Sequence, residues 1–302
     1  MPELPEVETM RRGVSPAIGH QIVSAECPPC SRKPILMEPN IQQWDRQLKG
    51  RTISSVGRIG KRVVLHIDEE HADALAIVIE PRMTGLVLIA DPPGAEHLRL
   101  RLRLSGANCE ELLFWDRRGL GTARLLTQEQ LRTRVQQRLG EDALCIEMEA
   151  LRARLRESRR AIKVALLDQS IVAGIGNLYA AEILFLAGVD PRTRCEKLSK
   201  PQWRRIHAAI AIVLNQAIAH EGSTLSDGTY RNALNHEGNY QNYHLVYDRA
   251  GESCRRCGVG VIRRIVQAQR STFFCPACQR RSGRHSAVKE ILVSPTASVA
   301  VQ

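Results

Sequence analysis

Four cysteines near the C-terminus have the spacing of a metal site. They form two Cys-x-x-Cys pairs with seventeen residues between the pairs: Cys254, Cys257, Cys275 and Cys278. Two such pairs present four thiolates to one tetrahedral zinc ion. Because four thiolates leave no open coordination position, we expect one structural Zn²⁺ per chain and no metal chemistry. The predicted zinc module spans residues 243–280.

A further pair, Cys27 and Cys30, has the same local spacing within Cys-Pro-Pro-Cys, but no second pair lies near it in sequence. A loop with incidental thiols is favoured over a metal or redox role, and both interpretations stay open. Cys109, Cys145 and Cys195 are isolated in sequence, so we expect them to be structural.

The charge of the chain points to a polyanionic partner. Its 302 residues carry a formal net charge of +11, and nine arginines lie between Arg249 and Arg284. Clustered Arg and Lys gain affinity by displacing counterions from phosphates, so nucleic acid is the first candidate. The alternative is that these residues only solvate the surface, but their concentration around the predicted zinc site favours a nucleic-acid partner.

The sequence gives no sign of export or membrane insertion. Residues 1–6 are acidic and rich in proline, unlike a secretory signal, and no later stretch is apolar enough to span a bilayer. We therefore expect a cytoplasmic, nucleoid-associated protein with no membrane partner. Its cysteines should then be thiols or metal ligands rather than disulfides.

The elements that position these groups fall into two blocks, of which the first is rich in strands. Residues 98–104 alternate leucine with arginine, which predicts a half-buried strand with leucines on one face and arginines on the other. Similar runs occur in four other segments: 62–67, 74–80, 85–90 and 111–115. Together they predict an antiparallel sandwich or barrel, preceded by a helix that opens near Pro5.

Helical periodicity dominates the second block. Helices are expected over residues 131–139, 150–157, 161–169, 178–187 and 202–220. The segment Gly-Ile-Gly-Asn at 174–177 breaks two of them in a tight turn and gives a helical hairpin. As a dinucleotide-binding fingerprint the segment is weak, because neither a third glycine nor a preceding strand accompanies it.

Three less regular segments follow. Residues 221–242 are polar, glycine-containing and rich in asparagine, and they predict a mobile loop. Between the two cysteine pairs, arginines mix with apolar residues, as in a β-hairpin that offers cations to a groove. Residues 281–302 lack periodicity and predict a disordered tail.

The N-terminal segment resembles the signature of the formamidopyrimidine-DNA glycosylases. Residues 2–9 read Pro-Glu-Leu-Pro-Glu-Val-Glu-Thr, and the resemblance continues in family order to Cys278. The later matching segments are 60–62, 83–85, 116–121, 174–180 and 268–273. The resemblance implies a multidomain α+β fold. Its expected parts are an N-terminal antiparallel β-sandwich with flanking helices (1–130), a helical helix-two-turn-helix domain (131–242) and a β-hairpin zinc finger (243–280).

The resemblance also implies a bifunctional DNA glycosylase and AP lyase of base excision repair. Its substrates would be 8-oxoguanine and formamidopyrimidines in double-stranded damaged DNA, and it would act as a monomer without an organic cofactor. Once Met1 is removed, Pro2 carries a secondary amine that can attack a sugar carbon. The iminium formed at C1′ is an electron sink that permits β- and then δ-elimination of the flanking phosphates.

Three other residues complete the implied catalytic set. Glu3, next to the nucleophile, is placed to move protons during ring opening and base departure. By resemblance Lys61 is the second catalytic group, located on a strand and approaching the damaged base or its phosphate. Arg270 of the finger is implied to contact phosphate beside these groups.

Flipping a nucleotide out of the duplex leaves a gap that the enzyme must fill. The resemblance assigns this role to Met83 on one turn and to Arg118 and Leu120 on another. The family usually has Asp-Pro-Arg-Arg-Phe-Gly where residues 116–121 read Asp-Arg-Arg-Gly-Leu-Gly, so an aromatic wedge is replaced by Leu120. A second departure is Glu-Pro-Arg at 80–82, where the family usually has His-Leu-Gly.

Further DNA contacts also follow from the resemblance. Phosphate contacts are expected at Lys163 and Asn177, and also at His97. The backbone amides of the turn at 174–177 would suit a phosphate because a helix begins there. The loop that closes over the extruded base is expected to include three residues: Ser223, Thr224 and Tyr230.

Two alternatives remain open. One is an endonuclease VIII-like enzyme of the same fold that prefers oxidised pyrimidines, although that relative usually begins Pro-Glu-Gly-Pro-Glu, whereas Leu4 stands here. The other is a zinc-dependent DNA-binding protein without activity. A pure binder has no need of Pro2, Glu3 and Lys61, and all three are present.

Overall fold

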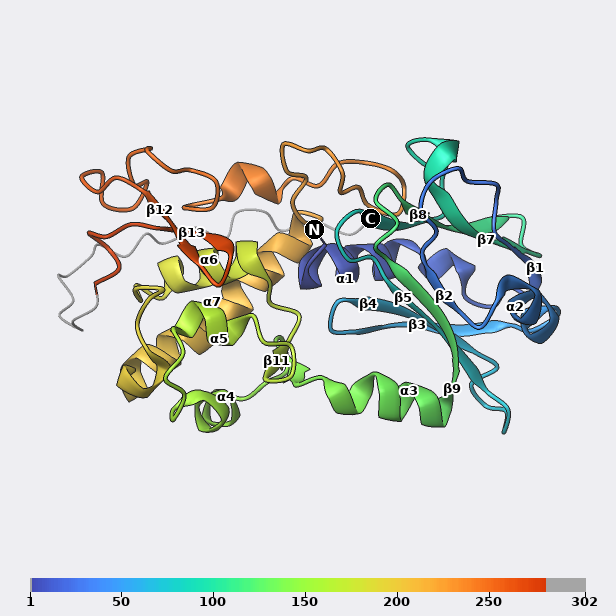
Figure 1. Ribbon diagram of the computed structural model, residues 1–302, viewed down its shortest axis with the longest axis horizontal. Coiled ribbons are helices and arrows are strands. Elements are labelled where there is room, and N and C mark those ends of the chain that lie inside the picture. The colour runs from blue at the N-terminus through green and yellow to red at the C-terminus, as the bar shows by residue number, and fades with distance from the viewer. Residues whose placement is uncertain (1, 281–302) are drawn as a thin grey trace, which may run out of the picture.

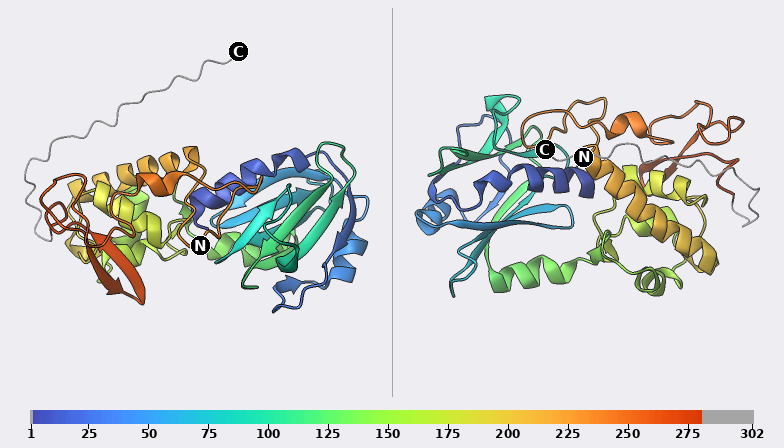
Figure 2. Two further views of the ribbon diagram at one scale, coloured as in Figure 1. Left: turned by 90° about the horizontal axis from the view of Figure 1, so that it is seen from above. Right: turned by 180° about the vertical axis from the view of Figure 1, so that it is seen from behind.

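The computed structural model describes residues 2–280, which form two lobes side by side along the long axis of the molecule (Figure 1). The disorder predicted for residues 281–302 falls outside the described residues. One lobe holds two β-sheets, and the other holds the longer helices and the C-terminal hairpin (Figure 2). Within residues 2–280 no helix is both long and apolar enough to cross a membrane.

The first lobe is a sandwich of two sheets, as predicted. One sheet has the strand order β1 (Ile22–Glu26), β7 (Leu98–Leu104), β8 (Glu111–Asp116), β6 (Gly85–Leu88). The other has the order β2 (Leu36–Glu38), β9 (Thr122–Thr127), β5 (Leu75–Glu80), β4 (Arg62–Ile67), β3 (Ile53–Ile59). All neighbours pair antiparallel except β2 and β9, which are parallel. The strands β4 to β8 had been predicted, whereas β1, β2, β3 and β9 had not.

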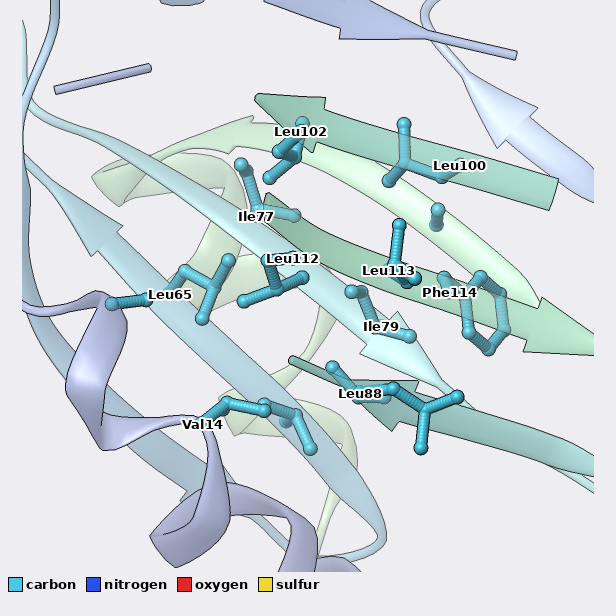
Figure 3. Close-up of a cluster of buried hydrophobic side chains, with 14 of the residues drawn as sticks. Val14, Leu65, Ile77, Ile79, Leu88, Leu100, Leu102, Leu112, Leu113 and Phe114 are labelled. Atoms are coloured by element: carbon cyan, nitrogen blue, oxygen red, sulfur yellow. The ribbon is translucent and has the colours of Figure 1, made fainter. Parts of the chain in front are cut away.

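Branched and aromatic side chains from both sheets fill the space between them. Figure 3 shows Ile77 and Ile79 of β5 facing Leu100 and Leu102 of β7, and Phe114 of β8 lies in the same layer. All five side chains are fully buried. Alternation in each strand sends every second residue into this layer, which is why the period-two pattern predicted the sandwich.

Arg99 departs from the predicted alternation. The arginines of β7 were expected to face away from the core, but Arg99 is only 5% exposed. The pairing of β7 with β8 explains this, because Leu98 pairs with Trp115 and Leu100 pairs with Phe114. The extra residue between them is a β-bulge, and a bulge redirects its side chain.

Helix α1 (Leu4–Gly13) joins the two lobes. Its first residue, Leu4, packs in the helical core, while Val7 and Met10 pack in the sandwich core. Helix α2 (Ile41–Leu48) lies against β1, and α3 (Gln128–Arg134) covers the outer face of the five-stranded sheet. Helix α3 begins and ends earlier than the predicted 131–139.

The second lobe contains four helices expected from the sequence. They are α4 (Met148–Leu155), α5 (Ile162–Leu166), α6 (Asn177–Leu186) and α7 (Lys200–Ala219). Helix α5 is shorter than the predicted 161–169. A short parallel pair, β10 (Glu141–Asp142) with β11 (Val172–Ala173), precedes the Gly-Ile-Gly-Asn turn. The short 3₁₀ helices are η1 (Ser15–Ala17), η2 (Ala95–His97), η3 (Gln136–Arg138), η4 (Cys195–Lys197) and η5 (Tyr240–Tyr243).

The C-terminal hairpin consists of β12 (Arg263–Gln267) and β13 (Arg270–Phe274). Its two-residue turn has positive φ at both Ala268 and Gln269, the conformation that a tight hairpin requires. Phe273 packs with Ala181 and Phe185 of α6 in a small separate core. The hairpin is therefore held against the helix that follows the Gly-Ile-Gly-Asn turn.

Candidate functional site

The N-terminus is fixed against the start of α6. The Glu3 carboxylate accepts the backbone N–H of Leu178 at 3.0 Å and that of Tyr179 at 3.4 Å. The N–H of Leu4 donates to the carbonyl of Gly174 at 3.0 Å. Pro2 is buried directly before Glu3. A helix N-terminus presents free N–H groups and partial positive charge, so it stabilises the Glu3 carboxylate.

The glycines of the Gly-Ile-Gly-Asn turn make this approach possible. A Cβ on Gly176 would lie 2.2 Å from the Glu3 carboxyl carbon. Gly174 has φ +109°, which other residues rarely adopt, and a Cβ there would meet Leu4. The amides of Leu178 and Tyr179, directly after the turn, thus bind Glu3, and the Gly174 amide donates to Gln169 Oε1 at 2.9 Å. A phosphate contact at the remaining amides of the turn stays a prediction.

Lys61 and Arg270 come from different lobes, and the charges of Glu3 and Arg270 both act on the Lys61 ammonium. Lys61 occupies the two-residue turn between β3 and β4, not a strand as predicted. Burial lowers the pKa of Lys61, the carboxylate of Glu3 opposes this, and the charge of Arg270 lowers the pKa further. Arg270 begins β13 and is exposed. The structure therefore brings these predicted residues together.

The Lys163 ammonium binds protein acceptors and not a phosphate, in contrast to the prediction. Its side chain is completely buried, and its ammonium donates to Asn177 Oδ1 at 2.6 Å, to the Ser271 carbonyl at 3.0 Å and to Thr272 Oγ1 at 2.7 Å. An ammonium has three N–H donors, so protein acceptors use all of them. Lys163 instead ties the finger hairpin to the turn. Because Asn177 Oδ1 is occupied, only the amide N–H groups of Asn177 remain to meet a phosphate.

The predicted wedge residues lie on two turns that are bonded to each other. Thr84 Oγ1 donates to the Asp116 carboxylate, and the backbone N–H of Arg118 donates to Thr84 Oγ1 at 3.0 Å. Met83 and Leu120 are each 36% exposed despite being apolar, and Arg118 is exposed. We call residues 116–121 the wedge loop. Its position beside Met83 fits the predicted gap-filling role.

His97 lies apart from Asn177 and Arg270. Its ring packs edge-on against Trp115, with 5.4 Å between ring centroids, and its Nε2 lies 3.5 Å from the Glu96 carboxylate. Strand β7, which follows His97, and the finger hairpin lie at opposite ends of the molecule (Figure 1). Any phosphate that His97 contacts is therefore different from one held by Arg270.

The predicted lesion loop is anchored by the residues that were expected to cover the base. Ser223, Thr224 and Tyr230 are all buried, and Tyr230 packs in the sandwich core. Thr224 Oγ1 donates to the Tyr230 carbonyl at 2.7 Å, which closes the loop at its base. The exposed part is the tip, residues 226–228, so these residues and not the anchors are free to cover a base.

A buried polar network that the sequence did not predict joins the lesion loop to α1. The Glu6 carboxylate accepts the N–H of Ser223 at 2.9 Å and the hydroxyl of Tyr179. Ser223 Oγ lies 3.0 Å from Nε2 of His244. Burial and the charge of Glu3 raise the pKa of Glu6, and burial together with two arginines lowers the pKa of His244 to about 4. The only part of this network that the sequence indicated was Glu6, which lies within the N-terminal octapeptide.

The four predicted zinc ligands lie together. The Sγ atoms of Cys254, Cys257, Cys275 and Cys278 are all within 4.8 Å of one another. The Cys254–Cys278 and Cys257–Cys275 sulfur pairs are 3.8 and 3.9 Å apart. A tetrahedron with Zn–S bonds of about 2.3 Å has edges of about 3.8 Å, so the four thiolates fit Zn²⁺.

Glycine also shapes this zinc site. A Cβ on Gly260 would lie 2.5 Å from Cys275 Sγ, and the Gly260 N–H donates to Cys257 Sγ at 3.3 Å. Cys257 therefore has the kind of outer hydrogen bond that orients a metal ligand.

Three family models match the chain in order. The formamidopyrimidine-DNA glycosylase N-terminal domain matches residues 1–123, the H2TH domain of the same enzymes matches 139–229, and the zinc finger found in FPG and IleRS matches 251–281. The formamidopyrimidine-DNA glycosylase of Chloroflexus aurantiacus is 38% identical over 281 residues, which cover 92% of this chain and 98% of that protein. The chain belongs to the formamidopyrimidine-DNA glycosylase family. The Streptococcus mutans member is 35% identical over 287 residues, covering 93% of this chain and 100% of that protein.

Solved structures of the family have the same fold. The Lactococcus lactis Fpg in complex with abasic-site DNA superimposes with a TM-score of 0.80 at 33% identity, covering 92% of this chain and 99% of that one. The same enzyme in complex with Fapy-dG containing DNA gives a TM-score of 0.78 at 32% identity, covering 92% of this chain and 100% of that one. Both matches span the two lobes and therefore include the site around Glu3.

Proposed function

We propose that this chain is a bifunctional DNA glycosylase and AP lyase that removes 8-oxoguanine and formamidopyrimidines from duplex DNA. The observation that carries the proposal is the buried Glu3 carboxylate, held by the N-terminus of α6 directly after Pro2. Lys61 of one lobe senses the charges of both Glu3 and Arg270, so cations from both lobes act on this part of the site. The relatives are named for formamidopyrimidine, and the Lactococcus lactis enzyme is described with Fapy-dG and abasic-site DNA.

The reaction begins at Pro2 once Met1 has been removed. The nitrogen lone pair attacks C1′ of the damaged nucleotide, the glycosidic bond breaks, and the base departs with a proton. Glu3 supplies the proton that opens the sugar ring, and loss of the ring oxygen from C1′ leaves an iminium. Backbone N–H groups fix the carboxylate of Glu3, so it keeps one position while it gives and takes protons.

Elimination follows from the iminium. Loss of a proton from C2′ breaks the C3′–O bond, and a second elimination breaks the C5′–O bond, so both flanking phosphates leave. Arg270 and the amide of Asn177 supply positive charge and N–H donors for those phosphates. Lys61 and Lys163 add positive charge nearby, and Lys163 acts by holding Asn177 and the finger in place.

The wedge residues and the zinc module serve duplex binding. Met83, Arg118 and Leu120 fill the gap that the extruded nucleotide leaves, and the zinc holds the hairpin that carries Arg270. Zn²⁺ bound by the four cysteines has no part in the chemistry. The protein would work on chromosomal DNA in the cytoplasm.

Borohydride trapping tests the proposal. Protein confirmed by mass spectrometry to begin at Pro2 should form a covalent complex with a duplex that contains 8-oxoguanine opposite cytosine, because borohydride reduces the iminium. Protein that retains Met1 should form none. A trapped complex that forms faster with oxidised pyrimidines would assign the enzyme to the endonuclease VIII-like type. Absence of any trapped species with each damaged duplex would leave only a DNA-binding role.

A further inference from the structure

The segment Cys27-Pro-Pro-Cys30 contacts the wedge loop through a buried arginine. An Nη1–H of Arg99 donates to Cys30 Sγ at 2.7 Å, and the Nε–H of the same guanidinium donates to the Asp116 carbonyl at 2.9 Å. Asp116 is the first residue of the wedge loop. One cation thus touches the Cys30 sulfur on one side and the wedge-loop backbone on the other.

Arg99 lacks the partners that a buried cation needs. It is only 5% exposed, and its Nη2 has no hydrogen-bond partner among residues 2–280. No carboxylate in this described part of the chain forms an ion pair with Arg99 either. A buried guanidinium without a counter-anion is costly, so an anion beside it would be stabilised. The Cys30 sulfur is the atom placed to carry one.

The backbone after Cys30 also packs on the wedge loop. A Cβ on Gly119 would lie 2.4 Å from the carbonyl oxygen of Lys33 and 3.6 Å from Arg99 Nη2. Gly119 has φ +61°, so the loop is tightly fixed at this point. A change at Cys30 therefore reaches the wedge loop by two routes, through Arg99 and through Lys33.

We propose that Cys30 is a site of oxidation by hydroperoxides, that the resulting sulfenate is bound by Arg99, and that oxidation displaces the wedge loop. Reactive cysteines are partly exposed and lie beside cations, and Cys30 meets both conditions. The sulfur attacks one peroxide oxygen, an S–O bond forms and the O–O bond breaks. The other oxygen leaves, takes a proton and becomes water or an alcohol. Sulfur loses two electrons and the peroxide gains them.

The product fits the guanidinium better than the thiol does. The new oxygen can accept from both Nη1 and Nη2, which satisfies the unpaired Nη2. It also places one more atom between the sulfur and a guanidinium that is bonded to Asp116, so the wedge loop must shift.

Cys27 is not placed to convert the sulfenate into a disulfide. Its Sγ faces the sulfur of Met37 at 3.6 Å, and residues 27–30 form neither a turn nor a bend. Pro28 and Pro29 favour the polyproline conformation, which advances about 3.1 Å per residue and would hold the two Cα atoms beyond the reach of about 7 Å that a disulfide allows. Cys27 is therefore a matched control for Cys30.

The experiment uses the zinc-loaded full chain treated with hydrogen peroxide. A cyclic 1,3-diketone traps sulfenates, and peptide mass spectrometry locates the adduct. We expect the adduct on Cys30 in the unchanged protein and in Cys27→Ser, and none at residue 30 in Cys30→Ser. Zinc release is followed with a chelating dye, and the peroxide dose is kept below the one that releases zinc. No adduct at Cys30, or a preferential adduct at Cys27, would overturn the modification site.

The second measurement is the affinity for a duplex with an abasic-site analogue, and it rests on the proposed DNA binding. Oxidation should lower the affinity several-fold in the unchanged protein and in Cys27→Ser but not in Cys30→Ser. Equal affinity before and after oxidation of Cys30 would refute the effect on the wedge loop. Failure of the untreated protein to bind the duplex would instead count against the proposed function and leave the adduct result standing.

Discussion

The Glu3 carboxylate accepts the N–H of Leu178 at 3.0 Å, across 175 residues of sequence. This bond places Glu3, the neighbour of Pro2, at the N-terminus of a helix in the other lobe. It also explains Gly176, since any larger residue there would occupy the space of the carboxyl group. The start of the chain and the Gly-Ile-Gly-Asn turn are therefore one structural unit.

Gly176→Ala should abolish excision with little effect on duplex affinity. The added Cβ would lie 2.2 Å from the Glu3 carboxyl carbon and force the carboxylate away from α6. Loss of a positioned proton-transfer group costs about 10²- to 10⁴-fold in rate. Single-turnover excision of 8-oxoguanine measures this. Gly94→Ala is the control, because the atoms nearest to its Cβ belong to the flexible carboxylate of exposed Glu96. Equal losses in both variants would contradict the prediction.

Lys163→Met should loosen the finger. The substitution keeps the length of the side chain but removes its bonds to Asn177, Ser271 and Thr272. Buried acceptors left without donors cost about 1–3 kcal/mol. Urea unfolding and limited proteolysis of the finger measure the change. Lys200→Met, at an exposed position on α7, should leave both unchanged.

The stability of the protein should fall in acid because of His244. Burial, Arg249 and Arg255 lower its pKa to about 4, whereas an unfolded histidine has a pKa near 6.5. Between these pH values the histidine binds a proton in the unfolded state and not in the folded state. The free energy of unfolding therefore keeps its full value above about pH 6.5 and falls as the pH is lowered towards 4. The loss is on the order of 3 kcal/mol. Urea unfolding at several pH values should show that the free energy of unfolding falls less between pH 6.5 and pH 4 in His244→Gln than in the unchanged protein. An equal fall in both proteins would refute this assignment.

Removal of the zinc site should abolish duplex binding without unfolding the sandwich lobe. Cys275→Ser removes one of four ligands, and the finger packs on the helical lobe through a small core and the bonds of Lys163. Gel-shift binding should be lost, while the sandwich keeps its thermal unfolding transition. Metal analysis should find one zinc in the unchanged chain. Cys145→Ser, at an exposed position, is the matched control and should bind as before.

Leu120→Phe should strengthen binding to damaged duplexes. Leu120 is 36% exposed on the wedge loop, where a phenyl ring can stack on the neighbouring base pair. Aromatic stacking contributes about 0.5–1.5 kcal/mol, which is about 2- to 10-fold in affinity. Ile212→Phe, on the exposed face of α7, adds the same ring elsewhere and should not raise the affinity. Equal gains in both variants would show a non-specific effect.

The sequence by itself determined the local features of this protein. The spacing of Cys254, Cys257, Cys275 and Cys278 predicted the zinc site because metal-ligand geometry follows from local chain spacing. Period-two alternation predicted the sandwich because strand geometry sends alternate side chains to opposite faces. Resemblance from Pro2 to Cys278 pointed to the family, and the residues of the octapeptide indicated the nucleophile and its acid.

Only the tertiary structure decided which distant groups meet. The burial of Lys163 and its use of all three donors depend on the finger docking against α6, which no local pattern encodes. The inward turn of Arg99 depends on a bulge in the pairing of β7 with β8, and pairing register is a property of two strands together. For the same reason, the contact of Glu3 with α6 emerged only when the two lobes were in place.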